Sequence, residues 1–337
     1  MKRRTINVIV LLGLGLIIIL FLFNIIGFQR IVSSLRKLNM YYYLIVISLV
    51  VGGSFLWAMR WGIFVKKTNP EVPNIELFKM MLIGQSVNNL TPIVKMGGEV
   101  SRVYLLNKKF KIKGKEGFAS VASDLTLEFI VDGIVVMIAM VLLLIFTNPP
   151  TWIFIAILIF ALMSSLIIFI IMDIYYGLSI VNRIVVWICE KLESVKKQEY
   201  DILEKYEAFR EHFKKGLQNK KMFSKGLSLS FMRKSFEGMK YYVLLAALGH
   251  QIGFISIFIA VGLSITLLLI PGIPGNVGVY EGGMTAVLIF LGVPPGIAAT
   301  TVFLDRLVWY WGITGAGGIL GTKYGLDLLA KKKAGEI

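Results

Sequence analysis

Cysteine and histidine are nearly missing from this sequence of 337 residues, which has a single cysteine, Cys189, and two histidines, His212 and His250. One cysteine excludes a disulfide within the chain, and these three residues leave no metal-ligand cluster. The patterns H-E-x-x-H, G-x-S-x-G and the P-loop do not occur either. We therefore expect no metal, no cofactor and no catalytic residues, so the sequence is not that of a recognisable enzyme.

Acidic residues are also few. The chain has 20 Asp and Glu against 36 Lys and Arg, which gives a formal net charge of +16, while 56% of its residues are hydrophobic and the mean hydropathy is +0.76. A basic chain can bind nucleic acid, but here the basic residues lie between apolar runs, as expected for the cytoplasmic loops of a membrane protein. This composition predicts an all-α polytopic membrane protein with no nucleic-acid partner.

The apolar runs predict about six full spans. They lie at 6–28, 41–65, 118–146, 151–172, 227–248 and 296–320. Basic residues at 2–4 and 331–333 place both termini in the cytoplasm, and the plasma membrane is the expected location. Segment 227–248 has a second interpretation, as an interfacial helix that leads into a span starting near Met239. Arg60, near the end of the second span, either snorkels to the interface or belongs to a site.

Two broken stretches predict re-entrant helical hairpins, because irregular backbone at membrane depth is tolerated only where protein or a wet cavity surrounds it. In the first, 74–106, an apolar helix at 74–90 is broken at Thr91-Pro92 and followed by a short helix at 99–106. The second, 251–292, is broken around Pro271. If 251–270 instead crossed fully, the lysines at 331–333 would end outside, so the positive-inside rule favours the hairpin.

The two broken stretches share an order of elements. In each, a proline stands seven residues before a glutamate, and an aspartate follows the glutamate by 25 or 24 residues. The residues are Pro92, Glu99 and Asp124 in the first stretch and Pro274, Glu281 and Asp305 in the second. Since the hairpins are predicted to enter from opposite sides, repeats at about 41–146 and 227–320 would be inverted within a single transmembrane domain, 1–337. The segment 173–225 between them is predicted to be a cytoplasmic insert of amphipathic helices.

Charged residues occur where the sequence is otherwise apolar. Ser120, Asp124, Glu128 and Asp132 recur every four residues, so they share a helical face, which must point to the protein interior because acids facing lipid are costly. At the hairpin tips, helix N-termini and basic side chains suit an anion, and glycines allow close approach. Candidate substrate-binding residues are Lys95, Gly97, Gly98, Glu99, Arg102, Gly275, Asn276, Gly278, Glu281 and Arg306. Candidates for ion coupling or ion pairing are Asp124, Glu128 and Asp305.

Such a site favours a phosphate-bearing, anionic lipid headgroup, so the leading hypothesis is a flippase-like lipid translocase. We expect Glu99 and Glu281 to share one cavity. In the plainer alternative, Glu99 only pairs with Arg102, and Asp305 only neutralises the neighbouring Arg306.

Two other classes of function stay open. A membrane scaffold could dock a cytoplasmic enzyme of lipid or glycolipid biosynthesis through 173–225, and an intramembrane lipid-modifying enzyme could use Asp124 and Asp305 as paired carboxylates. Small residues at four-residue spacing favour close helix packing or, less strongly, a homo-oligomer contact. They are Gly317, Gly321 and Gly325.

The stretches NNLTPIVKMGGEVSRVYLL (88–106), PGIPGNVGVYEGG (271–283) and LDRLVWYWGITGAGG (304–318) resemble the transmembrane family of lysylphosphatidylglycerol synthases, also called flippase-like. The likeness covers roughly residues 30–320. It implies an integral membrane protein of paired re-entrant hairpins, related to the lipid-translocating half of aminoacyl-phosphatidylglycerol synthases and to domains fused to glycosyltransferases of lipid-linked sugar pathways.

Eleven residues match the two motifs of that family. They are Pro92, Gly97, Gly98, Glu99 and Arg102 in the first, and Pro271, Pro274, Gly275, Gly278, Glu281 and Arg306 in the second. The chain departs from the usual family residues at Ile93-Val94-Lys95, Ile273 and Asn276, so the resemblance does not name the headgroup. The soluble aminoacyltransferase domain of the synthases has no counterpart in this sequence, and lysyl transfer is not expected.

Overall fold

A computed structural model describes residues 28–91 except 37, 97–147, 219–268 and 276–333, with isolated residues between 149 and 214. This part of the chain is helical and has no strand. The predicted spans 6–28 and 151–172, and most of 173–225, lie outside the described residues. The helices are α2 (Phe28–Leu35), α3 (Met40–Thr68), α4 (Asn74–Leu90), α5 (Gly97–Phe110), α6 (Gly114–Phe146), α11 (Lys220–Ala247), α12 (Phe254–Leu268), α13 (Val279–Phe290), α14 (Pro295–Arg306), the π-helix η2 (Leu307–Gly312) and α15 (Ile313–Lys333).

Two of the described helices, α3 and α6, are long and apolar enough to cross a membrane. They correspond to the predicted spans 41–65 and 118–146, with a few more residues at the ends. The predicted span 227–248 falls within α11, one uninterrupted helix that starts at Lys220, so a separate span starting near Met239 is not observed. The predicted last span, 296–320, is likewise part of a longer helical run, α14–η2–α15, that continues to Lys333.

The four helices of the two predicted hairpins are too short to cross a bilayer alone, because about 20 residues are needed. α4 has 17 residues, as predicted for 74–90, α5 has 14, α12 has 15 and α13 has 12. α5 is longer than the predicted helix at 99–106. The chain enters α13 through Asn276 and Gly278, both with positive φ (53° and 85°), a backbone conformation that glycine adopts without strain.

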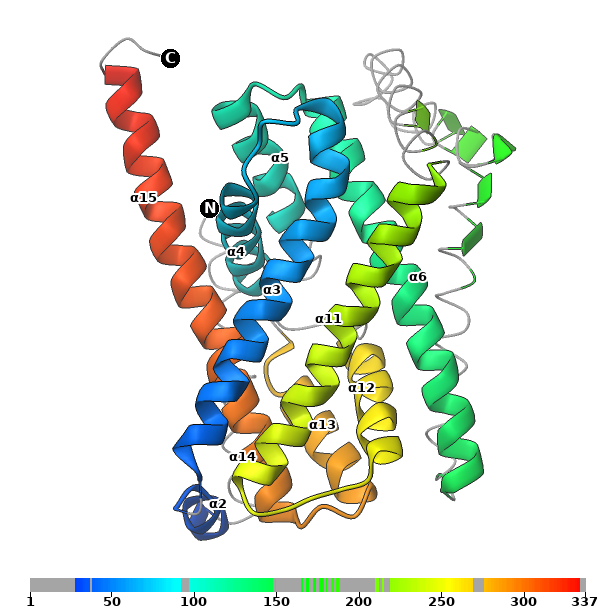
Figure 1. Ribbon diagram of the computed structural model, residues 1–337, viewed down its shortest axis with the longest axis vertical. Coiled ribbons are helices and arrows are strands. Elements are labelled where there is room, and N and C mark those ends of the chain that lie inside the picture. Colours follow the sequence, from blue (N-terminus) through cyan, green and yellow to red (C-terminus); the bar gives the residue numbers. More distant parts are fainter. Residues whose placement is uncertain are drawn as a thin grey trace.

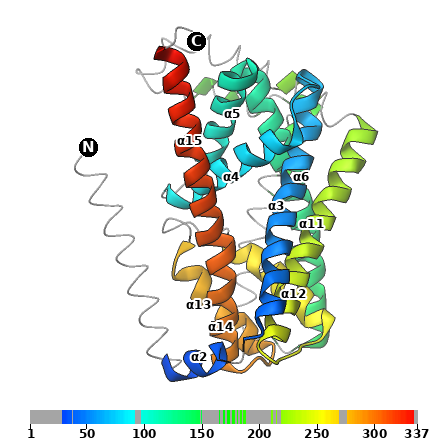
Figure 2. The ribbon, with the colours of Figure 1, turned by 60° about the vertical axis from the view of Figure 1, so that its left-hand side comes forward.

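Helices from the two halves of the chain pack against each other, so that a short helix of each half contacts a long helix of the other half (Figures 1 and 2). α3 and α11 lie side by side along the middle of the molecule, α4 packs against α15, and α12 packs against α6. Glycines make two of these contacts close. A Cβ on Gly317 of α15 would stand 2.1 Å from Leu82 O of α4, and a Cβ on Gly262 of α12 would stand 2.2 Å from Ala139 Cβ of α6. The prediction of close packing is therefore confirmed for Gly317. A Cβ on Gly321 would lie at ordinary contact distance from Ile83 of α4, 3.6 Å, and a Cβ on Gly325 would meet none of the described atoms within 4 Å.

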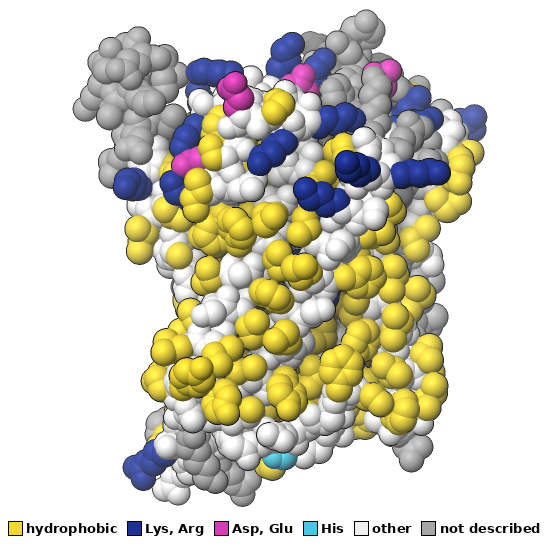
Figure 3. All heavy atoms as spheres, in the orientation of Figure 1, with side chains coloured by type: hydrophobic (Ala, Val, Ile, Leu, Met, Phe, Trp, Pro, Cys, Tyr) yellow, Lys and Arg dark blue, Asp and Glu magenta, His cyan; other side chains and the backbone are white. Residues whose placement is uncertain are grey.

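The outer surface divides into an apolar belt and a basic end (Figure 3). Large apolar side chains are exposed along α3 and α6, for example Leu44, Val51, Met137 and Ile145. Lys and Arg gather at the end where α3 stops and α5 meets α6, and few lie at the opposite end. Exposed apolar area of this extent is typical of a surface that faces lipid.

At the basic end, Glu76 joins three helices. Lys79 of α4 and Lys109 of α5 lie 2.8 Å and 2.5 Å from its carboxylate, and the Tyr324 hydroxyl of α15 donates to it. Burial alone would raise the pKa of Glu76, but hydrogen bonds from Lys109, Lys79 and Tyr324 lower it from 4.5 to about 2. The carboxylate therefore stabilises this end of the protein in its charged form.

We expect Glu76→Gln to lower the free energy of unfolding by about 1–2 kcal/mol near neutral pH. Because the folded-state pKa is depressed, the stabilisation is complete above about pH 4.5 and is lost as the pH falls toward about 2. Thermal unfolding of detergent-purified protein should thus show a difference between wild type and variant that shrinks in acid. Glu71→Gln, at an exposed glutamate, is the control. A difference that grows in acid would contradict the assignment.

Candidate functional site

A first set of charged side chains, the α3–α6 network, lies between α3, α5, α6 and α11, with five members buried and four partly exposed. Its members are Arg60, Glu99, Arg102, Asp124, Glu128, Asp132, Arg233, Lys234 and Glu237. These residues are far apart in the sequence, but ion pairs connect them into one continuous network from Glu99 to Glu237. Charges inside apolar helices are costly unless they are paired, so an interior network of this size makes this region a candidate functional site.

Arg60 is the centre of this network and is fully buried, with 0% exposure. Its Nε donates to Asp124 Oδ1 at 2.7 Å, and its Nη1 pairs with Glu128 and donates to Ser230 Oγ at 2.9 Å. Trp57 Nε1 donates to the other Asp124 oxygen at 3.1 Å. The interpretation of Arg60 as a snorkelling residue is therefore wrong, because its partners on α6 hold it in the interior.

The first hairpin tip joins the network through Arg102 and Glu99. Arg102 donates to Asp124 at 3.4 Å and to Glu99 at 3.3 Å, and its guanidinium lies 5.1 Å from the ring centre of Trp61. Asn88, at the end of α4, donates to Glu99 at 3.1 Å and accepts from the backbone N–H of Gly98 at 2.7 Å. The amide of Asn88 thus closes the hairpin, although the sequence did not single it out.

Gly98 is required at this tip. A Cβ there would stand 2.1 Å from the backbone oxygen of Gly84 and 2.7 Å from the Asn88 side chain. We expect Gly98→Ala to separate α4 from α5 and to destabilise the protein by about 1–3 kcal/mol. Gly133→Ala on α6, where a Cβ meets nothing within 4 Å, should be neutral or slightly stabilising. Thermal unfolding of both variants checks this, and equal behaviour of the two would contradict it.

On the other side of Arg60 the network continues along α11. Arg233 pairs with Glu128 and lies 4.3 Å from the ring centre of Trp57. The Lys234 ammonium is 2.6 Å from Asp132, and 3.5 Å from both Glu128 and Glu237. One lysine is therefore shared by three carboxylates.

A second set, the α11–α14 network, is buried in the other half of the molecule. Lys240 lies 2.7 Å from Asp305, which is fully buried and also accepts a hydrogen bond from the Tyr241 hydroxyl at 3.2 Å. The hydroxyls of Tyr241 and Tyr280 are 2.5 Å apart. The idea that Asp305 neutralises the neighbouring Arg306 is wrong, because consecutive helical residues point in different directions and Asp305 finds its cation on α11.

Arg306 instead pairs with the second hairpin tip. Its Nε donates to Glu281 at 2.6 Å, and its guanidinium lies between the rings of Tyr280 and Tyr310, 4.9 Å and 4.5 Å from their centres. The other oxygen of Glu281 accepts from the Gly278 N–H at 2.6 Å. The nearby loop is also held at Asn276, whose amide donates to the carbonyls of Leu267 and Leu268.

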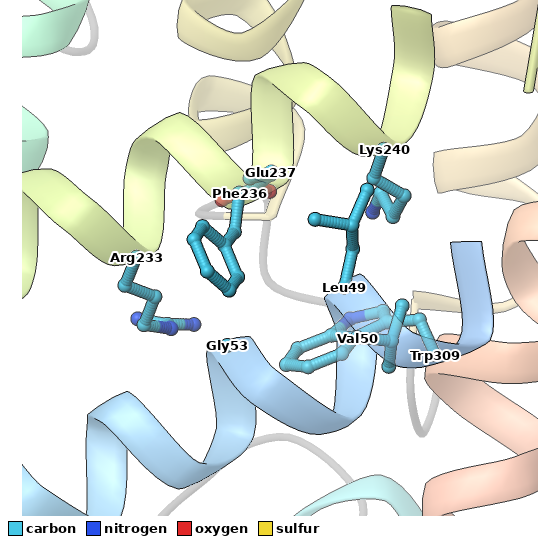
Figure 4. A pocket seen from close by; sticks show the side chains of 8 residues that line it. All are labelled: Leu49, Val50, Gly53, Arg233, Phe236, Glu237, Lys240 and Trp309. Carbon is cyan, nitrogen blue, oxygen red and sulfur yellow. The ribbon is translucent and has the colours of Figure 1, made fainter. Parts of the chain in front are cut away.

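The two networks approach each other along α11. Arg233 and Glu237 of the first network and Lys240 of the second line one cavity of about 40 Å³ between α3, α11 and η2 (Figure 4). Since a water molecule needs roughly 10–15 Å³ by this measure, the cavity has room for about three. The end of α4 also contacts the C-terminal helices. The Tyr310 hydroxyl of η2 donates to the Asn89 carbonyl at 3.1 Å, and the Asn89 amide donates to the Thr314 hydroxyl of α15 at 2.8 Å.

The predicted site residues are thus divided between two places. Glu99, Arg102, Asp124 and Glu128, with Gly98 beside them, lie in or at the α3–α6 network, whereas Gly278, Glu281, Asp305 and Arg306 belong to the second half. No contact among the described residues joins Glu99 to Glu281, so their sharing of one cavity stays a prediction. Lys95 and Gly275, together with Pro92, Pro271 and Pro274 of the motifs, lie outside the described residues.

Sequence reasoning did not predict several of the residues that complete the networks. Two signals for them existed: the stripe of charges on α11 inside an apolar stretch, and tryptophans one turn from buried charge. The residues are Trp57, Trp61, Asn88, Arg233, Lys234, Glu237, Lys240, Tyr241, Tyr280 and Tyr310. Across the described residues, no group of His, Cys, Asp and Glu is arranged to hold a metal ion.

An all-helical chain with an apolar belt, a basic end and charges paired in its interior defines the class of helical membrane proteins. Within that class the chain belongs to the family of the lysylphosphatidylglycerol synthase TM region, whose sequence profile matches residues 8–317.

Similar proteins come from archaea. A UPF0104 membrane protein of Methanothermobacter thermautotrophicus is 26% identical over 316 residues, 91% of this chain and 93% of the relative. UPF0104 membrane proteins of Pyrococcus horikoshii and Methanocaldococcus jannaschii are also 26% identical, over 94% and 92% of this chain and 96% and 93% of those relatives. The similarity therefore extends over nearly the whole length of this chain and of each relative.

Proposed function

We propose that this protein is a lipid translocase that carries an anionic, phosphate-bearing headgroup past the apolar belt while the hydrocarbon chains stay in the bilayer. The observation that carries the proposal is the pair of buried ionic networks, one in each half of the molecule. Ionisable residues inside a membrane protein are rare, face its interior, pair with one another and mark substrate and ion pathways.

Helix packing supports two inverted repeats. With α3, α4, α5 and α6 matched to α11, α12, α13 and α14–α15, the central pair α3–α11 maps onto itself. The contact of α4 with α15 maps onto the contact of α12 with α6. Such an exchange is expected when two similar units are related by a two-fold axis in the membrane plane. The short pairs α4–α5 and α12–α13 then correspond to two re-entrant hairpins, entering from opposite sides.

The ion pairs follow the same correspondence. Arg60 on the first helix of one repeat binds Asp124 on the fourth, and Lys240 on the first helix of the other binds Asp305 on the fourth. A glutamate in the first turn of each short helix also pairs with an arginine, but the arginines differ in position, because Arg102 lies on α5 with Glu99 whereas Arg306 lies on α14 and Glu281 on α13. The support from ion pairs therefore rests on the correspondence of Arg60–Asp124 with Lys240–Asp305.

The tips offer what a phosphate needs. Arg102 and Arg306 are buried beside short helices whose N-terminal N–H groups favour negative charge. A phosphate could replace Glu99 or Glu281 as the partner of the nearby arginine without leaving that cation unpaired. Three buried atoms of the first network, Arg60 Nη2, Glu99 Oε2 and Asp132 Oδ1, have no hydrogen-bond partner among the described residues, although Asp132 Oδ1 lies 2.6 Å from the Lys234 ammonium. The network therefore has capacity for a polar guest.

Liposomes test the proposal directly. We expect the purified, folded protein to make fluorescently labelled phosphatidylglycerol accessible to external dithionite faster than empty liposomes do, and Arg306→Gln to slow this exchange. Glu71→Gln, at an exposed turn, should exchange lipid like wild type. If no labelled anionic lipid exchanges faster than in empty liposomes, the proposed function is wrong.

A further inference from the structure

A cavity of about 500 Å³ lies between α6, α11 and α12, three helices that run together in Figure 1. Its walls are mostly apolar, with Val135, Ile257 and Val261 among the buried lining residues. Phe231, Met239, Tyr242 and Phe254, which also line it, are 41%, 52%, 45% and 80% exposed. The cavity therefore opens sideways onto the apolar surface, and its size is that of a site for a ligand of a few hundred cubic ångströms.

Gly238 of α11 keeps this cavity open. A Cβ placed there would meet Ile257 and Val261 at 3.6 Å and 3.8 Å, which is ordinary contact distance. A larger side chain would extend from that point into the empty volume. The position is therefore suited to a filling substitution that leaves the helix backbone undisturbed.

The cavity also reaches one charged group, Lys234, which belongs to the α3–α6 network. That network has five carboxylates (Glu99, Asp124, Glu128, Asp132, Glu237) and four cations (Arg60, Arg102, Arg233, Lys234). A further negative charge beside Lys234 would increase this excess in a medium of low dielectric constant. Such a guest can be accommodated if a carboxylate takes up a proton at the same time.

Asp132 is the carboxylate best placed to do so. Within ion-pair distance it has Lys234 as its one cation, whereas Glu128 has Arg60, Arg233 and Lys234 among the described residues. Glu237 pairs with Lys234, and it lines the smaller cavity of about 40 Å³ together with the cations Arg233 and Lys240. The neighbouring helix α12 has no ionisable side chain, and neither does the sequence at 151–172, so nothing from those segments compensates Asp132.

We propose that this lateral cavity binds one hydrocarbon chain of an anionic lipid whose phosphate pairs with Lys234, and that Asp132 binds a proton as the phosphate replaces it. The Lys234–Asp132 ion pair is exchanged for a Lys234–phosphate pair, and the proton from solvent forms an O–H bond on Asp132. One negative charge and one proton enter together, so the net charge of the network is unchanged. This deepens the proposed function, on which it rests for the idea that the protein transports such a lipid.

Filling the cavity tests the binding site without any transport assay. Native mass spectrometry of detergent-purified protein mixed with phosphatidylglycerol should show bound lipid for wild type and at least about tenfold weaker binding for Gly238→Leu. Gly133→Leu on α6, where a Cβ has open space, should bind like wild type, and Gly238→Ala serves as a folded, less obstructive variant. Unchanged binding in Gly238→Leu, or equal binding of phosphatidylcholine, would overturn the proposal.

The proton is tested by the pH dependence of the same binding. Wild-type affinity for phosphatidylglycerol should weaken with rising pH, approaching about tenfold per pH unit for one linked proton, and Asp132→Asn should remove this dependence. A wild type without pH dependence, or an Asp132→Asn variant that keeps it, would overturn the coupling. Failure of the liposome assay with these binding results intact would count against the proposed transport alone, whereas transport unaffected by Gly238→Leu would count against this site alone.

Discussion

Arg60→Met should be among the most damaging single substitutions in the chain, with a loss of about 3–5 kcal/mol in the free energy of unfolding. The reason is electrostatic: the α3–α6 network would keep five carboxylates against three cations, and fully buried Asp124 would keep Arg102, 3.4 Å away, as its one cation among the described residues. Methionine replaces the apolar stem of the arginine, so lost packing contributes little. The thermal unfolding midpoint of the purified protein should fall by roughly 10 °C.

The matched control is Arg36→Met, because Arg36 is exposed at the end of α2. It should change stability by less than about 0.5 kcal/mol. Adding Asp124→Asn and Glu128→Gln to Arg60→Met should restore part of the loss by removing the two excess negative charges of the network. A stable Arg60→Met protein would show that the network is not held together by this residue.

Lys240→Met should have an effect of similar size in the other half, again about 3–5 kcal/mol, because fully buried Asp305 would keep only the Tyr241 hydroxyl as its described partner. The double variant Lys240→Met/Asp305→Leu should be more stable than Lys240→Met, since it removes both charges. A double-mutant cycle from thermal or denaturant unfolding should give a coupling energy above about 1 kcal/mol.

Lys225→Met is the control here, on an exposed position of the same helix α11. It preserves the helix and changes only a surface charge, so a small effect is expected. If Lys240→Met and Lys225→Met unfold alike, the second network does not contribute as the geometry indicates. The Arg60 and Lys240 variants together test corresponding ion pairs of the proposed repeats.

Local sequence patterns were sufficient to predict the bounds and buried faces of several helices. The four-residue spacing of Asp124, Glu128 and Asp132 placed them on one face of α6, and the structure buries that face as predicted, with Asp124 at 0% exposure. The apolar run ended by Thr91-Pro92 gave the bounds of α4 because a residue before proline leaves the helical region. These features depend on neighbours along the chain, which a sequence displays directly.

Partners between distant helices were not predictable in the same way. Periodicity gives the face of a helix but not its register against another, so the pairing of Lys240 with Asp305, rather than Arg306 with Asp305, required the structure. Arg60 stood close enough to a helix end for either of two roles, and only the position of α6 decided between them. The charges of α11 made its path ambiguous for the same reason, because their partners lie on α6 and α14.

Opposite insertion of the two hairpins is the central claim, and sided labelling of single cysteines tests it most directly. In a Cys189→Ser background, Glu71→Cys and Lys113→Cys mark the ends of the first hairpin, and Gln251→Cys and Pro294→Cys mark the ends of the second; all four positions are exposed. A membrane-impermeant maleimide should label the first pair from the cytoplasmic side only and the second pair from the outer side only. Labelling of all four from one side, or of one hairpin's two ends from different sides, would contradict the inverted arrangement and the translocation site built on it.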